Sequence, residues 1–190
     1  MSKLTCKDTK LEGVKIITSK IYEDSRGFFR ELYNKEDLKE IGITTTFIQD
    51  NCSMSSIGVI RGLHYQKKYP QIKLVTCIYG SLLDVVVDIR VGSPTFGKHI
   101  MVELHDGDSK SIYIPEGFAH GFRSLNSETV ISYKCSDYYV PGDDGGVLWS
   151  DPDLNIKWQG FLDPVISEKD KSYDRLCYIN EEELPQYKGV

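Results

Sequence analysis

Residues 73–90 read KLVTCIYGSLLDVVVDIR, two runs rich in β-branched and large apolar residues that meet at Gly80. Two such runs separated by a glycine turn are typical of a β-hairpin, so this stretch predicts a pair of antiparallel strands. Because side chains alternate between the faces of a strand, the second run has one wholly apolar face and one face that carries Asp84 and Asp88. A face with two acids either meets solvent or lines a polar cavity.

The same composition recurs along the rest of the chain. Six further runs have the composition of strands: residues 14–22, 28–33, 47–53, 99–104, 111–114 and 129–139. NKEDLKEIG (34–42) predicts one short helix with Asn34 as its N-cap and Gly42 at its C-terminal end. SEKD predicts a second helical turn that begins at Ser167. Many short strands with few helices indicate an all-β fold, a closed antiparallel sandwich or barrel.

Composition and missing motifs exclude several classes of protein. The chain of 190 residues carries 23 Lys and Arg against 28 Asp and Glu, a net charge of -5, whereas nucleic-acid binders usually carry a basic excess. No apolar run approaches the roughly 20 residues of a membrane helix, and the N-terminal residues lack the apolar stretch of a secretory signal. The sequence contains neither a glycine-rich phosphate loop nor the G-x-S-x-G elbow of serine hydrolases. We therefore expect a cytoplasmic protein without nucleic-acid or membrane partners, whose five cysteines are reduced thiols.

Two histidines lie in settings that suggest chemistry. His120 ends the spacing P-x-G-x-x-H in IPEGFAHGF (114–122), which resembles the second motif of the cupin jelly roll. The first cupin motif needs two metal-binding histidines two residues apart, but the corresponding place reads His64-Tyr65-Gln66. Because a metal site needs three or four converging ligands, we expect a cupin-type antiparallel jelly-roll barrel with no metal and no other cofactor. Both histidines then remain available for acid–base chemistry.

The sequence as a whole resembles one enzyme family. Seven motifs in order carry the resemblance: DSRGFFRE (24–31), QDN (49–51), GVIRGLHYQ (58–66), DVVVDIRVGSPTFG (84–97), IPEGFAHGF (114–122), YKCSDYYVP (133–141) and ISEKD (166–170). They cover nearly the whole chain and are similar to those of the dTDP-4-dehydrorhamnose 3,5-epimerase family. The resemblance implies a cofactor-free jelly-roll homodimer that inverts C3 and C5 of dTDP-4-dehydro-6-deoxy-D-glucose to give dTDP-4-dehydro-L-rhamnose. Without repeats or linkers, we expect one domain over residues 1–190, with an N-terminal arm (about 1–45), a jelly-roll core (about 46–150) and a C-terminal tail (about 151–190).

Four residues match the catalytic positions of that family. Both inverted carbons flank the C4 ketone, so the reaction needs a base on one face of the sugar and an acid on the other. The resemblance makes His64 the base, Asp170 the acid that orients and charges it, and Tyr133 the proton donor on the opposite face. It makes Lys73 the group that stabilises the enolate oxygen at C4. For Asp84 two interpretations stay open, an ion pair with Lys73 or an exposed acid.

The resemblance also implies a set of substrate-binding residues, among which arginine forks suit a diphosphate. The implied set is Arg26, Glu31, Gln49, Asp50, Asn51, Arg61, Lys73, His120, Asp144 and Lys169. The RGFFRE segment (26–31) resembles an arm that reaches the partner subunit's site, so that the homodimer shares its active sites. Phe28 and Phe29 either pack in the core or place one ring on the thymine base.

Four positions depart from the family pattern. Ile72 stands where a small residue usually precedes the lysine. Tyr79 and Ser81 replace an arginine and a glutamate, and Asp144 replaces a glutamate. These departures leave open a related epimerase that acts on another nucleotide 4-keto-6-deoxy sugar or inverts only one carbon. A catalytically silent cupin that binds sugar nucleotides and a metal-dependent cupin oxygenase are further alternatives, and the retained acid–base residues speak against the silent cupin.

Overall fold

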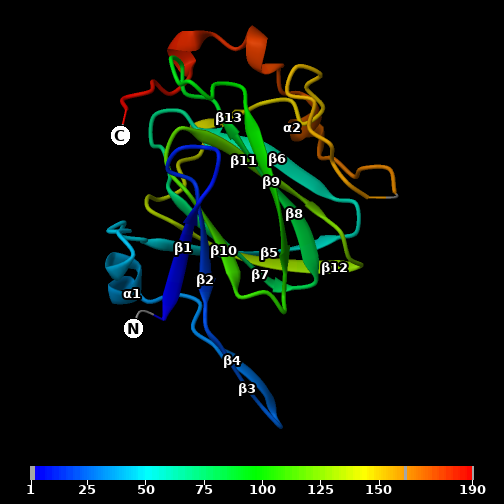
Figure 1. Cartoon of the computed structure of the whole chain (residues 1–190). Helices are drawn as coiled ribbons and strands as arrows, with labels where there is room; N and C mark the ends of the chain where they lie inside the picture. Colours follow the sequence, from blue (N-terminus) through cyan, green and yellow to red (C-terminus); the bar gives the residue numbers. More distant parts are fainter. Residues whose placement is uncertain (1–2, 161, 190) are drawn as a thin grey trace.

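The computed structural model describes residues 3–160 and 162–189, and most of its strands form two antiparallel sheets that enclose a barrel (Figure 1). The six-stranded sheet has the order β1-β2-β10-β7-β12-β5, the five-stranded sheet has the order β13-β6-β11-β8-β9, and β3 pairs with β4 alone. The strands are β1 (Leu4–Asp8), β2 (Lys15–Ser19), β3 (Ile21–Asp24), β4 (Gly27–Arg30), β5 (Gln49–Ser56), β6 (Ile60–Gln66), β7 (Lys73–Tyr79), β8 (Ser81–Asp88), β9 (His99–His105), β10 (Lys110–Ile114), β11 (Phe118–Ser124), β12 (Glu128–Cys135) and β13 (Asp144–Gly146). The helices are α1 (Lys35–Glu40) and α2 (Glu168–Lys171), with 3-10 turns at Leu176–Tyr178 and Glu181–Glu183.

The main core lies between the two large sheets. Leu82, Val86 and Phe122 from the five-stranded sheet pack in one buried cluster with Val75 and Ile131 from the six-stranded sheet. From β5 to β13 the chain changes sheet at nearly every connection, as in a jelly roll. The predicted all-β antiparallel barrel with a few short helices is therefore confirmed.

The hairpin predicted for residues 73–90 is wrong. β7 pairs with β10 and β12 in one sheet, and β8 pairs with β9 and β11 in the other, so the turn at Gly80 carries the chain between sheets. Gly80 has a φ of 78°, and a Cβ there would lie 2.3 Å from the carbonyl oxygen of Glu128. The turn needs glycine for both reasons. The choice of strand partner, however, depends on residues far away in the sequence.

The outer face of the five-stranded sheet is also buried, because the C-terminal tail covers it. Leu83 and Val85 of β8 belong to a second buried cluster that includes Leu154, Leu176 and Leu184 from the tail. All positions of β8 are consequently buried. This double burial explains why β8 is nearly continuous in apolar residues instead of alternating.

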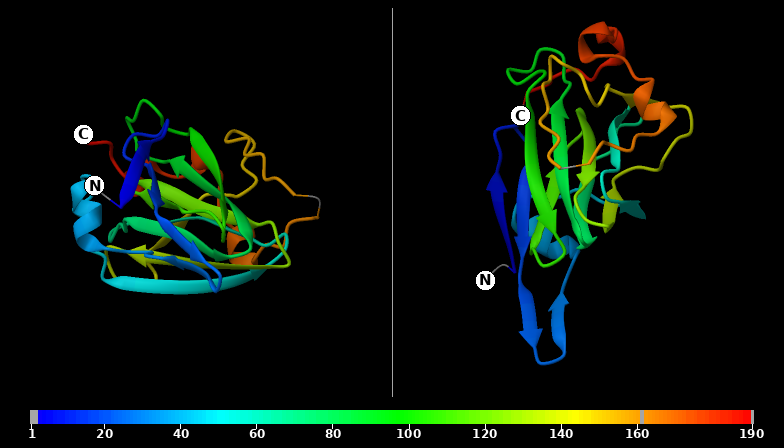
Figure 2. Two further views of the ribbon diagram at one scale, coloured as in Figure 1. Left: turned by 60° about the horizontal axis from the view of Figure 1, so that its bottom comes forward. Right: turned by 90° about the vertical axis from the view of Figure 1, so that its right-hand side faces the viewer.

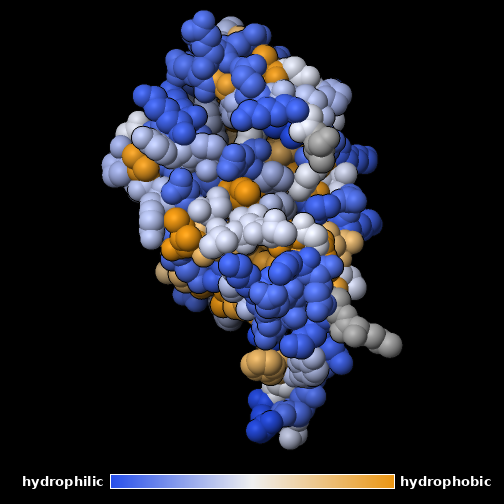
Figure 3. Space-filling model, turned by 90° about the vertical axis from the view of Figure 1, so that its left-hand side faces the viewer, coloured by the Kyte–Doolittle hydropathy of each residue, from blue (hydrophilic) through white to orange (hydrophobic). Residues whose placement is uncertain are grey.

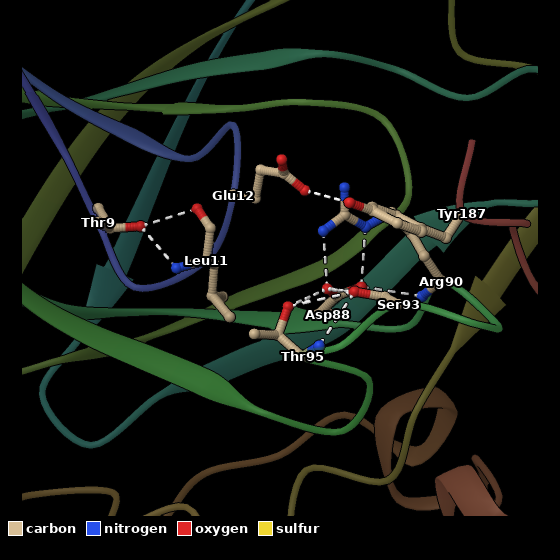
Figure 4. A network of polar contacts seen from close by, with 8 residues as sticks. All are labelled: Thr9, Leu11, Glu12, Asp88, Arg90, Ser93, Thr95 and Tyr187. Atoms are coloured by element: carbon tan, nitrogen blue, oxygen red, sulfur yellow. Dashed lines mark hydrogen bonds and ion pairs between the residues drawn. The ribbon is translucent and has the colours of Figure 1, made fainter. Parts of the chain in front are cut away.

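Both acids on the inner face of β8 are buried, and Asp88 has a structural environment. Its carboxylate accepts hydrogen bonds from the guanidinium of Arg90 and from the hydroxyls of Ser93 and Thr95 (Figure 4). Burial acts to raise the pKa of Asp88, but these hydrogen bonds outweigh burial and lower the pKa. Asp88 thus stays ionised inside the protein and fixes the turn that follows β8.

The same cluster ties the C-terminal tail to the barrel. The guanidinium of Arg90 lies 4.3 Å from the ring centre of Phe118 and 5.0 Å from that of Tyr187. The Tyr187 hydroxyl donates to Glu12 at 2.5 Å (Figure 4). Two backbone hydrogen bonds join Val91 to the same tail segment. One end of the barrel is closed in this way by segments from both ends of the chain.

β3 and β4 form a hairpin arm that projects from the barrel (Figures 1 and 2). We expected one strand over residues 14–22, but β2 ends at Ser19 and β3 begins at Ile21. The break arises because β2 pairs with β1 and β10 in the barrel, whereas β3 pairs only with β4. The two strands of the arm therefore make few contacts with the rest of their own chain.

The aromatic side chains of the arm are exposed. Phe28 is 62% exposed and Phe29 is 66% exposed, so core packing, one of the two interpretations of these rings, is wrong for this chain. Figure 3 presents the arm as a narrow projection in which apolar and hydrophilic residues lie side by side. Exposed aromatic rings on a projecting hairpin suit contact with another molecule.

The two predicted helices are confirmed. Asn34 caps α1 by accepting from the backbone amides of Glu36 and Asp37, and Ser167 caps α2 by accepting from the amide of Asp170. Neither helix within residues 3–160 and 162–189 has the length and apolar character needed to cross a bilayer.

Candidate active site

A cavity of about 220 Å³ opens between the two sheets and collects most of the predicted catalytic side chains. Both sheets contribute to its lining, which consists of Ser53, Arg61, His64, Lys73, His120, Gly121, Phe122, Ile131 and Tyr133. His64 and His120 lie opposite each other on the paired strands β6 and β11. Tyr133 and Lys73 come from β12 and β7 of the other sheet. Charged and proton-donating groups therefore converge from facing walls.

His64 forms a close pair with Asp170. Its Nε2 lies 2.7 Å from Oδ1 of Asp170, and the other carboxylate oxygen accepts from the backbone amide of Gly62 at 3.1 Å. Burial acts to raise the pKa of Asp170, but the hydrogen bonds from His64, Gly62 and Ser167 outweigh it, so the pKa is lowered. An ionised Asp170 holds the hydrogen on Nε2 and leaves Nδ1 of His64 as a proton acceptor.

His120 forms a second pair of the same kind with Asp84. Nε2 of His120 lies 2.8 Å from Oδ2 of Asp84, whose side chain is wholly buried. The other oxygen of Asp84 is buried and has no hydrogen-bond partner among the described residues. Both interpretations of Asp84 are therefore wrong, since it is neither exposed nor bonded to Lys73. The acid faces the polar interior and holds a histidine.

Lys73 lies at the start of β7, deep in the barrel. Burial lowers the pKa of its ammonium, while Cys135, Asp84 and Asp144 attract the charge and oppose that shift. Among the described residues, no carboxylate lies within the 4.0 Å of an ion pair with its Nζ. Lys73 consequently keeps its hydrogen-bond donors available to a molecule in the cavity.

Tyr133 faces the cavity from the opposite sheet, together with Ile131 of the same strand. Burial raises the pKa of its phenol above the usual value, with Arg61 opposing the shift. Tyr133 is therefore protonated at neutral pH and can donate a proton. Its neighbour Lys134 turns to the other face of the sheet and binds Asp50 at 2.5 Å.

The predicted QDN motif divides between the two faces of its strand. Gln49 donates to Asn51, and Asn51 donates to the thiol of Cys135, next to Tyr133 and Lys73 in the sheet. Asp50 points the other way, as strand alternation requires. Within this chain Asp50 is thus not brought to the cavity.

The remaining predicted binding residues lie near His64, at the cavity or on the arm. Asp144 accepts from Tyr139 at 2.8 Å and pairs with Lys169 at 3.2 Å, and burial opposes but does not cancel the lowering of its pKa by these partners. Arg61 lies at the cavity and donates to Ser55.

Two predicted binding residues lie away from the cavity in this chain. Arg26 pairs with Asp24 at the tip of the arm and its side chain is 86% exposed. Glu31, just beyond β4, lies near Lys3.

Sequence reasoning missed two tyrosines near the site. Tyr139 donates to Asp144, and the ring of Tyr173 contacts the imidazole of His64 with ring centres 5.9 Å apart. Their only signal in the sequence is proximity to the predicted residues Asp144 and Asp170. Within the described part of the chain, no group of three or more His, Cys, Asp or Glu side chains is arranged to hold a metal ion.

Comparison with known proteins identifies relatives over most of the chain. The sequence profile of the dTDP-4-dehydrorhamnose 3,5-epimerase family matches residues 8–177. The chain is 45% identical over 170 residues to the dTDP-4-dehydrorhamnose 3,5-epimerase of Methanothermobacter thermautotrophicus, covering 88% of this chain and 92% of that one. It is also 45% identical over 164 residues to the enzyme of that name from Shigella flexneri, covering 85% and 90%.

A solved structure extends the similarity to the fold. The crystal structure of dTDP-6-deoxy-D-glucose-3,5-epimerase from Legionella pneumophila, in complex with dTDP-4-keto-L-rhamnose, superposes with a TM-score of 0.95 at 43% identity, covering 98% of this chain and 100% of that one. The profile, the relatives and the superposed structure agree over nearly the full length. The chain belongs to the dTDP-4-dehydrorhamnose 3,5-epimerase family.

Proposed function

We propose that this protein inverts C3 and C5 of dTDP-4-dehydro-6-deoxy-D-glucose to give dTDP-4-dehydro-L-rhamnose. The observation that carries the proposal is the cavity between the sheets, where the His64–Asp170 pair on one wall faces Tyr133 on the other. A proton acceptor and a proton donor on opposite walls are what inversion of a carbon next to a ketone requires. The family membership supports the same assignment.

The proposed mechanism moves only protons. Nδ1 of His64 takes the proton from the carbon next to the C4 ketone, and the bonding electrons pass into the ketone to form an enolate. Tyr133 then gives its phenolic proton to the same carbon from the opposite side, which inverts it, and exchange with water restores both groups. The same cycle at the second carbon completes the reaction. Because no electron is transferred to or from the sugar, the reaction calls for no redox cofactor.

Asp170 and Lys73 stabilise the charges that this mechanism creates. The carboxylate of Asp170 stabilises the imidazolium that forms on His64. Lys73 donates to the enolate oxygen in a buried setting, where such a contact is stronger than in water. A lowered pKa makes the ammonium a stronger hydrogen-bond donor to that oxygen.

The size of the cavity indicates how the substrate lies. Its 220 Å³ is below the roughly 300–1,000 Å³ of pockets that enclose a whole drug-sized ligand, so we expect the sugar to lie inside it. The diphosphate and the nucleoside then lie along the rim, where Arg61 and Lys169 supply positive charge and Gln49 and Asn51 supply amides. His120, held by Asp84, contacts the bound sugar.

We further propose a homodimer in which the arm of one subunit completes the site of the other. Arg26, Glu31 and the two exposed phenylalanines lie on or next to a hairpin that has few contacts with its own barrel. A hairpin of this kind is too small to be stable alone and gains from packing on a partner. The arm then adds a guanidinium for the diphosphate and a ring for the thymine base.

Incubation with dTDP-4-dehydro-6-deoxy-D-glucose in deuterated water tests the proposed function. We expect deuterium at both C3 and C5 and a product with the L-rhamno configuration, read by NMR. Deuterium at C3 alone would identify a single-carbon epimerase. Absence of deuterium with retained binding would contradict the enzyme assignment and favour a silent binding protein.

A further inference from the structure

The ring of Tyr173 lies against the imidazole of His64. The ring centres are 5.9 Å apart and the planes meet at 66°, an edge-to-face arrangement. Tyr173 follows α2 by two residues and Asp170 by three, so one short segment supplies both contacts to His64. Figure 1 places α2 beside β6.

The neighbouring strand leaves room for this ring. Gly146 of β13 lies opposite His64 in the register, and a Cβ at Gly146 would lie 2.3 Å from the ring of Tyr173. Gly146 does not have a positive φ, so its backbone does not require glycine. The contact with Tyr173 is the feature that excludes a side chain there.

The hydroxyl of Tyr173 is buried and makes no hydrogen bond within 3.5 Å to another described residue. Its nearest polar neighbour is the ammonium of Lys169. Burial raises the pKa of the phenol, and the charge of Lys169 and a weak hydrogen bond with it oppose the shift. A backbone hydrogen bond of 2.9 Å from Leu148 to Asp174 anchors the segment instead. The ring therefore matters for its shape and its contact with the imidazole.

We infer that Tyr173 is a positioning residue that holds the imidazole of His64 in the orientation that faces both Asp170 and the cavity. Without the ring, the imidazole would have free space on one side and could rotate away from its productive orientation. An aromatic pair of this kind is a modest contact, so the effect is on the rate of proton abstraction and not on folding. The inference rests on the proposed role of His64 as the base.

Three single variants distinguish the effect of the Tyr173 ring from the effect of its hydroxyl and from any general effect of changing this segment. We expect Tyr173→Leu to lower kcat about 3- to 10-fold with little change in KM, and to slow deuterium exchange at C3 by the same factor. Tyr173→Phe keeps the ring and should retain nearly full activity. Tyr178→Leu is the matched control, because Tyr178 lies in the same segment, is 69% exposed and stacks on Arg175 instead of His64.

A double variant tests whether Gly146 acts through Tyr173. Gly146→Ala should displace the ring and lower kcat by a similar factor, whereas Gly107→Ala, which meets no atom within 4 Å, should have no effect. If both changes act on the same contact, Gly146→Ala combined with Tyr173→Leu should be no slower than Tyr173→Leu alone. Independent, multiplying losses would contradict the inference.

A measurement on the protein without substrate tests the positioning role of Tyr173 independently of epimerase activity. Because an aromatic ring shifts the NMR signals of protons next to it, we expect Tyr173→Leu to move the signals of the His64 imidazole protons and Tyr173→Phe to leave them in place. If the native protein lacks epimerase activity, the proposed function fails. If it is active but Tyr173→Leu turns over normally, or Tyr173→Phe is as slow as Tyr173→Leu, the positioning role is wrong.

Discussion

Two histidine–aspartate pairs present their histidines to the same cavity, and the pairs share a similar bond but differ in exposure and in hydrogen bonding. Nε2 of His64 lies 2.7 Å from Asp170, and Nε2 of His120 lies 2.8 Å from Asp84. The imidazole of His64 is 39% exposed and that of His120 is 11% exposed. His64 has space for a substrate to approach and for a proton to exchange with water. His120 is enclosed.

The two carboxylates differ as well. Both oxygens of Asp170 accept hydrogen bonds, one from His64 and one from the amide of Gly62. Asp84 uses one oxygen for His120 and leaves the other without a partner among the described residues. A fully bonded carboxylate holds its histidine in one tautomer through a catalytic cycle. A carboxylate with one free, buried oxygen suits a pair that binds a polar ligand, because the ligand can complete its contacts.

Replacement of the two histidines is the strongest test of this difference. We expect His64→Ala to lower kcat by about 10²- to 10⁴-fold, the usual value of general-base catalysis, and to leave the affinity for dTDP nearly intact. His120→Ala should instead act mainly by raising KM. Steady-state kinetics and calorimetry with dTDP measure the two effects. Near-normal turnover by His64→Ala would show that another group is the base.

Removal of the Tyr133 hydroxyl tests the proposed proton donor, which lies on the cavity wall opposite both histidine–aspartate pairs. Tyr133→Phe keeps the packing and removes only the proton, so we expect inversion to slow by about 10²-fold or more. Because His64 is intact, the variant should still exchange substrate hydrogen for deuterium from solvent. NMR follows exchange and inversion in the same sample. Inversion at both carbons near the native rate would mean that a different group donates the proton.

Replacement of either carboxylate should have a smaller effect on turnover than replacement of His64 or Tyr133, the two groups that exchange protons with the substrate. Asp170→Asn loses a charge-assisted hydrogen bond worth about 1.5–3 kcal/mol, so we expect kcat to fall by about 10- to 100-fold. Asp84→Asn removes a buried charge from an enclosed pair, and it should alter KM more than kcat. Equal effects of the two variants on kcat would erase the distinction between the pairs.

Local features of the fold were predictable because local chemistry determines them. The caps at Asn34 and Ser167 need only a side-chain oxygen close to free backbone amides, and both are present. The alternation along β8 correctly separated Asp84 and Asp88 from the purely apolar face. The turn at Gly80 was also identified, but its partners were not, because strand pairing depends on β9 to β12 and not on the turn itself.

Residue patterns alone predicted less of the site than of the fold. Asp170 lies 106 residues from His64, and only the family resemblance connected them. The sequence suggested Lys73 as the partner of Asp84, yet strand register places His120 beside Asp84. On the adjacent strands β8 and β11, Asp84 lies opposite Phe122 and His120 lies opposite Val86. Tyr173 carries no motif at all. Contacts that arise from packing between distant segments have no local signature.

The acid limit of stability gives the smallest expected effect and tests the His64–Asp170 pair without any substrate. The folded-state pKa of Asp170 lies below its ordinary value of 3.8, so ionised Asp170 stabilises the fold above that pH, and the contribution is lost as pH falls through the lowered value. We therefore compare the free energies of unfolding of the native protein and of Asp170→Asn. Their difference should be constant near neutral pH and should shrink below about pH 4. Urea unfolding at a series of pH values measures it, with Glu116→Gln, an exposed acid, as the control. A difference that does not change with pH would mean that Asp170 contributes to stability through its shape and not through its charge.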